Sequence, residues 1–352
     1  MLSKLLTWAT VLLAASSHAL AQGVTAQVTQ TDSSLTLPSY QPSQAAAPKD
    51  AGYLLPDGSI RVVGLGDMQG MIEQLNAFYT RTHPGTRFTY VKSNSLAAIY
   101  TLIFDGTAFA PAGIVYPSNL TYTDIVHGPP FSIRIAHGSL NPTAALSPLA
   151  IIVNRSNPLD KLSMSQVGSI FTQSMRARVL SHWNQLGLTG AFASTEIHPY
   201  GLPWTDHYPS EDTSFGDFFF FQKLSGAPPV DNYNVVKTYN DVVNRVSSDP
   251  SAIGVVALNH VTPGVKVIAI SDNGLKPPMA GTAVEIRSGQ YPLDRDLYLY
   301  ARVVSGKPFD PFVKEYMRMA LSREGQEIIG RESHGYIPLN ALEVEEELTT
   351  FQ

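Results

Sequence analysis

One stretch of the chain, residues 147–171, constrains the fold more than any other. It reads SPLAIIVNRSNPLDKLSMSQVGSIF. Residues 149–153 are an apolar run, too short for a helix and rich in β-branched side chains, which predicts a buried strand. The Asn-Pro pair that follows breaks the chain. Ser163 and Gln166 then form a capping box, in which each side chain satisfies a free N–H group at a helix start. The stretch therefore predicts a strand, a turn and a helix in succession.

The same alternation of strand and helix begins at residue 59. Short runs at 60–63 and 87–91 read as strands, and each precedes apolar residues at helical spacing. Alternation of this kind favours a parallel sheet with helices on both faces. The roughly 330 residues beyond position 21 are enough for a large core, most naturally in two lobes.

The first 21 residues predict export. A positive charge at Lys4 precedes a mostly apolar segment, residues 5–15, that is too short to span a bilayer. Small residues at Ala19 and Ala21 complete the pattern of a cleaved signal peptide. The chain contains no cysteine, which excludes the usual lipid anchor and any disulfide. We therefore expect a periplasmic or secreted protein, with no membrane insertion once the signal is removed.

Charge and motifs exclude several function classes. The net charge is -5 and no basic cluster appears, so we predict no nucleic-acid binding. The chain has no Gly-x-Ser-x-Gly elbow, no Gly-Lys-Ser/Thr phosphate loop and no His-Glu-x-x-His. Its nine histidines match no metal-ligand spacing. The sequence predicts a protein that is not an enzyme and uses neither cofactor nor metal.

Several pieces of the chain, in a fixed order, carry a family resemblance. They are NPLDKLSMSQVGSIFT, HWNQLGL, DPSAIGVVAL, YPLDRDLYLYA and ALSREGQEIIGRESHGYIPL. Together they resemble the phosphate-binding family of periplasmic solute-binding proteins, over most of residues 59–340. The resemblance implies a type II periplasmic binding-protein fold, an α/β fold with mainly parallel sheets flanked by helices in two lobes. It also implies a monomer that captures a small oxyanion, phosphate first, for an ABC-type permease.

The resemblance and the composition together give a domain plan. Residues 22–55 are rich in Gln, Ser, Thr, Ala and Pro, which predicts a flexible leader. The end of the chain is acidic, which predicts a solvated tail. The plan is: signal peptide 1–21, leader 22–55, first lobe 56–147, second lobe 148–290, return to the first lobe 291–342, and acidic tail 343–352.

The starts of helices offer the candidate binding groups. Open parallel sheets bind ligands at the carboxyl ends of their strands, where helix N-termini present free N–H groups and partial positive charge. One loop, residues 64–68, matches the family's first small-residue loop, with Asp67 where Ser or Thr is usual. Asp67 either caps its helix or accepts a proton from a protonated oxyanion. The predicted ligand-binding residues are Gly66, Asp67, Met68, Ser93, Asn94, Ser95, Thr213, Ser214 and Arg295.

One departure from the family pattern affects the ligand. The family's arginine belongs just after Gly201, where this chain has LPWTDHYP. A dianionic phosphate there lacks its strongest bidentate partner. Arg295 is the leading cation for the cleft, and a hinge salt bridge with Asp294 or Asp296 is its alternative role. Two further functions stay open: an organic or aromatic anion read by the 200–208 loop, and an exported adaptor or phosphate-scavenging accessory protein.

Overall fold

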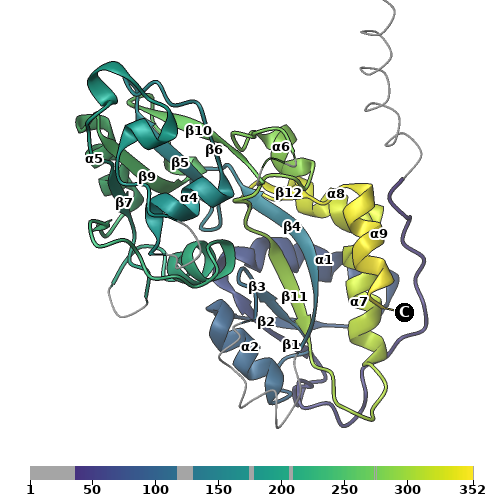
Figure 1. Ribbon diagram of the computed structural model, residues 1–352. Helices are drawn as coiled ribbons and strands as arrows, with labels where there is room; N and C mark the ends of the chain where they lie inside the picture. The colour runs from purple at the N-terminus through teal and green to yellow at the C-terminus, as the bar shows by residue number, and fades with distance from the viewer. Residues whose placement is uncertain are drawn as a thin grey trace, which may run out of the picture. The chain divides into compact units, whose positions relative to one another are not determined.

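A computed structural model describes residues 36–116, 130–173, 178–205, 209–272, 274 and 276–351 (Figure 1). Pro38–Gln352 forms one compact unit, separate from Met1–Leu37. The predicted signal peptide and the first part of the predicted leader, up to residue 35, lie outside the described residues. Within the described ranges, no helix has both the length and the apolar character needed to cross a bilayer.

A six-stranded sheet contains the strand predicted at residues 149–153. Its strand order is β6-β10-β5-β9-β7-β8. The run 149–153 lies in β5, every residue of which is buried, and the predicted capping box of Ser163 and Gln166 opens α4. The strands and helices of this part are β5 Leu149–Asn154, β6 Lys161–Ser163, α4 Met164–Phe171, β7 His198–Gly201, β8 Asn234–Val235, α5 Tyr239–Ser248, β9 Ala252–Ala257, β10 Val265–Ser271 and α6 Ala283–Arg287. A π-helix, η4, spans Asp217–Lys223, and short 3-10 helices include η5, Leu258–His260.

A four-stranded sheet, in the order β12-β4-β11-β3, and a parallel pair, β1-β2, make up the rest. Their elements are β1 Ile60–Leu65, η1 Gly66–Met68, α1 Gln69–Thr82, β2 Phe88–Ser93, α2 Ser95–Ile103, β3 Ala110–Ala112, β4 Phe131–Ser139, β11 Leu297–Ala301, α7 Pro311–Ala320, α8 Arg323–Arg331, β12 Tyr336–Pro338 and α9 Ala341–Thr349. Figure 1 shows β4 and β11 side by side.

The sheets are mixed, whereas the sequence predicts mainly parallel sheets. In the four-stranded sheet β11 is antiparallel to both β3 and β4, and β12 is antiparallel to β4. In the six-stranded sheet β5 is antiparallel to β9 and β10, while β7 is parallel to β8 and β9. The chain leaves one sheet through β4 and returns through β11, and strands that run out and back must be antiparallel.

The prediction of a flexible leader is wrong for residues 38–55. Tyr40 donates its hydroxyl hydrogen to Glu315 Oε1 at 2.7 Å, and Ser43 donates to both oxygens of the same carboxylate. Tyr53 is buried. Composition averages miss this anchoring, because two tyrosines and one distant glutamate outweigh many small polar residues.

This anchoring gives a first testable prediction. Replacing Tyr40 with phenylalanine keeps the ring against Phe78 but removes the hydrogen bond to the buried Glu315 carboxylate. We expect the free energy of unfolding, measured by urea denaturation, to fall by about 1–2 kcal/mol. The matched control is Ser39→Ala, an exposed neighbour, which should change nothing. Equal stability of Tyr40→Phe and the unaltered protein would refute the anchoring.

The predicted solvated tail is also wrong, since most of it forms α9. The side chains of Asn340 and Glu343 make a capping box at its start. Glu343 and Glu347 are buried, and Arg134 of β4 pairs with them at 3.2 and 2.6 Å. One strand arginine thus turns part of an acidic run into a packed helix face.

Candidate functional site

A cavity of about 500 Å³ lies where strands of all three sheets end. Leu65 and Ala257 are the last residues of β1 and β9, and Asn94 and Gly113 directly follow β2 and β3. This is the edge at which α/β sheets bind ligands. The lining residues are Leu65, Asn94, Ser95, Leu96, Gly113, Ile114, Ala144, Ala145, Leu146, Glu211, Asp212, Thr213, Ser214, Asp217, Tyr239, Ala257, Asn259 and His260.

The start of α2 forms one wall of the cavity. Asn94 is the helix cap, and its Oδ1 accepts a hydrogen bond from the Ala97 N–H at 2.8 Å. Ser95 Oγ accepts the Gly113 N–H at 3.0 Å, so its own hydroxyl hydrogen is left to donate. The first amides of a helix have no acceptor within it and carry partial positive charge. This wall therefore offers several hydrogen-bond donors to an anion.

The loop before η4 forms a second wall, and Arg295 holds it in place. The guanidinium donates to Asp212 Oδ2 and to Ser214 Oγ, both at 2.5 Å. Asp212 Oδ1 accepts from the Ser214 amide at 3.0 Å, and Tyr239 donates its hydroxyl hydrogen to Oδ2 at 2.7 Å. Burial alone would raise the pKa of Asp212, but the Arg295 charge and these hydrogen bonds hold it below its usual range. The Asp212 carboxylate is therefore ionised, and its hydrogen bonds fix the loop.

Arg295 does not form the salt bridge with Asp294 or Asp296 that was predicted as its alternative role. Its guanidinium pairs with Asp212, eighty-three positions away, instead of with neighbouring Asp294 or Asp296. It is 2% exposed and lies 5.2 Å from the Phe218 ring centre. The hinge pairing with its neighbours is therefore wrong. Arg295 is beneath the cavity wall and does not line the cavity.

The predicted binding residues divide into two groups. Asn94, Ser95, Thr213 and Ser214 line the one cavity. Gly66, Asp67, Met68, Ser93 and Arg295 do not, and their contribution to ligand binding stays a prediction.

Asp67 illustrates why the first loop behaves differently. Its carboxylate accepts the Tyr336 hydroxyl hydrogen and, at 3.2 Å, the Ala145 N–H. No side chain caps η1 or α1, so the capping role considered for Asp67 is wrong. The aspartate instead ties the start of the first helix to the segment that lies between β4 and β5.

Several lining residues escaped the sequence argument. Asn259 and His260 lie in η5, which directly follows the buried strand β9, so the rule that ligands bind at strand ends could have found them. Asn259 donates through Nδ2 to the carbonyl oxygens of Asn141 and Ala144, both at 3.0 Å. It thereby links the crossing segment to η5, a contact that no local pattern predicts.

The aromatic loop at 200–208 does not contribute its described rings to the cavity. Trp204 stacks on Phe221, with ring centres 6.2 Å apart, and neither it nor Tyr200 lines the cavity. His207 and Tyr208 lie outside the described residues. Trp204 therefore packs on η4 and not on another aromatic residue of the loop.

Among the described residues, one group has ligand atoms close enough to hold a metal ion: His137, Asp294 and Asp296, within 4.8 Å of one another. It lies apart from the cavity-lining residues. Both ring nitrogens of His137 already face carboxylates, Asp294 at 2.7 Å and Glu343 at 3.0 Å. A metal ion would have to displace a proton from the ring.

Comparison with known proteins identifies the family. Residues 43–324 match the PBP superfamily domain. The phosphate-binding protein PstS of Pseudomonas aeruginosa is 30% identical over 206 residues, 57% of this chain and 61% of that protein. The phosphate-binding protein PstS 2 of Streptococcus agalactiae is 31% identical over 110 residues, 31% of this chain and 34% of that protein. The chain thus spans less than two thirds of these relatives.

Two solved structures share the fold at low identity. PstS from Borrelia burgdorferi matches with a TM-score of 0.55 and 17% identity, over 80% of this chain and 98% of that one. An ABC-type phosphate transport receptor from Vibrio cholerae matches with a TM-score of 0.51 and 19% identity, over 79% of this chain and 99% of that one. With the domain match across residues 43–324, these findings show that the chain belongs to the PBP superfamily and has the type II periplasmic binding-protein fold.

Proposed function

We propose that this chain is an exported solute-binding protein that captures a small oxyanion, phosphate first, and delivers it to an ABC-type permease. One observation carries the proposal: the start of α2 and the loop before η4, both singled out from the sequence, line a single cavity. Relatives named as phosphate-binding proteins support the choice of ligand. Export rests on the predicted signal peptide, residues 1–21.

The cavity can bind an anion without a cationic side chain on its wall. Amides of the first turn of α2 and the hydroxyls of Ser95 and Thr213 supply donors. The carboxylates of Glu211 and Asp217 also line the cavity. Carboxylates repel a fully ionised oxyanion but accept a hydrogen bond from one that keeps a proton. The site therefore suits a protonated phosphate better than sulfate, with these acids as the proton acceptors; the same role for Asp67, which does not line the cavity, stays a prediction.

The test is calorimetric titration of the chain from Gln22 onward with phosphate and with sulfate. We expect phosphate to bind and sulfate to give no measurable heat. Replacing the exposed Thr213 by valine removes a hydroxyl donor at nearly constant shape. A hydrogen bond to a charged group contributes about 1.5–3 kcal/mol, so the phosphate Kd should rise about tenfold or more.

The matched control is Trp204→Ala, a side chain outside the cavity, which should leave the phosphate Kd unchanged. Sulfate binding as tight as phosphate, or no heat with any oxyanion on protein shown to be folded, would contradict the proposal.

The size of the cavity favours one second candidate. About 500 Å³ falls within the range of sites for organic ligands, and Leu96 and Tyr239 add apolar surface. A larger organic anion is therefore the alternative ligand, held by the same donors rather than by the 200–208 loop. Tighter binding of a phosphorylated organic acid than of phosphate in the same titration would select it.

A further inference from the structure

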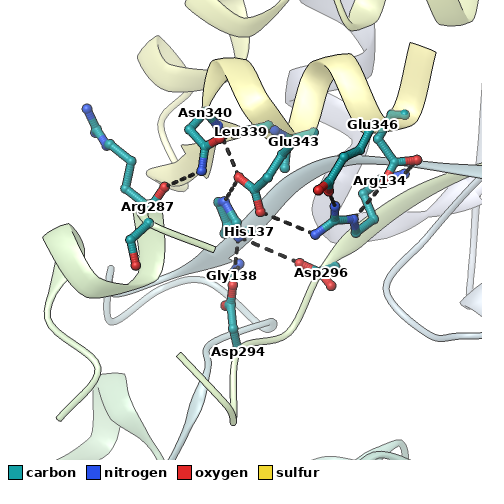
Figure 2. Close-up of polar contacts among 12 residues, drawn as sticks. Arg134, His137, Gly138, Arg287, Asp294, Asp296, Leu339, Asn340, Glu343 and Glu346 are labelled. Atoms are coloured by element: carbon teal, nitrogen blue, oxygen red, sulfur yellow. Dashed lines mark hydrogen bonds and ion pairs between the residues drawn. The ribbon is translucent and has the colours of Figure 1, made fainter. Parts of the chain in front are cut away.

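A buried histidine connects three segments of the chain. His137 lies in β4 and has no exposed surface. Its Nδ1 is 2.7 Å from Asp294 Oδ2 and 3.6 Å from Asp296 Oδ1, and its Nε2 is 3.0 Å from Glu343 Oε2 (Figure 2). Carboxylates accept hydrogen bonds and cannot donate them when ionised. With both carboxylates ionised, both ring nitrogens carry hydrogen and His137 is an imidazolium.

The surrounding charges maintain that state. Burial alone would lower the pKa of His137, but hydrogen bonds to Asp294, Asp296 and Glu343, with the charge of Asp294, raise it to about 11. Loss of the proton would leave two nearly buried carboxylates facing a neutral ring. The ring stays charged throughout the neutral pH range.

Other charged groups complete the cluster around these carboxylates. Arg134, on the same strand, binds Glu343 at 3.2 Å, Glu347 at 2.6 Å and Glu346 at 3.5 Å. Lys223 lies with Asp294 and Asp296 on a neighbouring cavity of about 150 Å³. The second cation on that cavity, Arg295, already binds Asp212.

The cluster lies where the chain passes between the two sheets. β4 leads into residues 140–148, which carry Ala144, Ala145 and Leu146 to the ligand cavity. Asp294 and Asp296 belong to the returning segment before β11, and Asp294 Oδ1 also accepts the Gly138 N–H at 3.4 Å. Arg295, between the two aspartates, holds the loop that forms the other wall. The imidazolium thus joins the crossing segment that brings Ala144, Ala145 and Leu146 to the cavity to the crossing segment from which Arg295 holds the loop before η4.

We propose that the His137 imidazolium, itself held by Glu343 of α9, fixes the two crossing segments and so sets the positions of residues 144–146 and of the loop before η4 around the cavity. His137 and Glu343 are positioning residues for anion binding, an inference that rests on the proposed function. Helix α9, far from the cavity in sequence, then contributes to ligand affinity through the two crossing segments.

The test uses Glu343→Gln, which keeps the side-chain shape and removes one of the charges that stabilise the imidazolium. The pKa of His137 should fall below that in the unaltered protein, because one of its three carboxylate partners becomes neutral, so more of the ring loses its proton as the pH rises from 6 to 9. Phosphate Kd should then increase over that range by about fivefold or more beyond the change in the unaltered protein, the lower end of usual coupling between sites. Nitrogen NMR of the ring reports its protonation directly.

The matched control is Glu346→Gln, on the same helix. Glu346 has a side chain that is 61% exposed and meets Arg134 at 3.5 Å, so this variant should follow the unaltered protein at every pH.

Three results would overturn the inference: a ring with one proton at pH 7 in the unaltered protein, a Zn²⁺ ion bound at the ring nitrogen, or unaltered phosphate binding by Glu343→Gln. If the unaltered protein binds no oxyanion, the proposed function fails and takes this inference with it. If only the variant's pH dependence is missing, the proposed function stands.

Discussion

Replacing His137 with glutamine is expected to lower the free energy of unfolding at pH 7 by about 3–5 kcal/mol, the usual cost of removing one partner from a buried ion pair. The reason is geometric. Asp294 Oδ2 and Glu343 Oε2 lie 2.7 and 3.0 Å from the ring nitrogens, and both side chains are nearly buried. A neutral amide cannot balance their charges. Urea denaturation at pH 7 measures the difference.

The pH dependence gives this prediction its sign. His137 has a pKa of about 11 in the folded protein, above the 6.5 of a free histidine. Its stabilisation is therefore complete below about pH 6.5 and is lost as the pH rises toward 11. The gap in unfolding free energy between the unaltered protein and His137→Gln should narrow over that window. The control is His198→Gln, whose side chain is 42% exposed and pairs with Asp249, and which should cost far less. A gap that is absent, or that widens with pH, would exclude the imidazolium.

Local patterns predicted the parts of the fold that neighbouring residues decide. The capping box of Ser163 and Gln166 and the buried strand over 149–153 formed as expected, because their determinants lie within a few positions of one another. The start of α7 at Pro311, capped by the Asp310 side chain, depends in the same way on hydrogen bonds made inside one helical turn.

The errors share a different physical cause. Residues 38–55 and the acidic end of the chain are polar in composition, yet each is packed by partners that lie far away in the sequence. Glu315 holds Tyr40 from 275 positions away, and Arg134 holds Glu347 from 213. Composition averages such a segment and cannot register a single long-range contact. A rule based on solubility of polar segments therefore fails at both ends of the compact unit.

The same division between local and long-range determinants applies to the site. Ser95 and Ser214 were predicted from helix starts expected near the ends of strands, a rule that uses only the order of elements, and both line the cavity. The partner of Arg295 was missed because Asp294 and Asp296 are its neighbours in sequence, whereas Asp212 is its neighbour in space. Adjacent side chains on an extended segment point apart, which should have weighed against the nearer aspartates.

Replacing Arg295 with methionine is expected to cost about 3–5 kcal/mol of unfolding free energy and to abolish the proposed phosphate binding. Arg295 is 2% exposed and its partner, the Asp212 carboxylate, is 10% exposed, so the variant leaves an unpaired buried charge. It also frees Ser214, whose Oγ accepts from the guanidinium at 2.5 Å. The loop before η4 then loses the contact that places it against the cavity. Urea denaturation and calorimetric titration measure the two effects.

The double variant Arg295→Met with Asp212→Asn separates lost packing from unpaired charge. With the carboxylate gone, the double variant should be more stable than Arg295→Met alone, which makes the two substitutions strongly non-additive. Acid gives an independent check. In the unaltered protein the pKa of Asp212 is lowered, which stabilises the folded protein at pH values above the usual pKa of an aspartate. This stabilisation is lost as the pH falls. In Arg295→Met the burial of an unpaired carboxylate raises that pKa, so the penalty should shrink between pH 7 and pH 4. A double variant no more stable than the single one, with a penalty independent of pH, would mean that Arg295 acts by packing on Phe218 and not by holding the charge of Asp212.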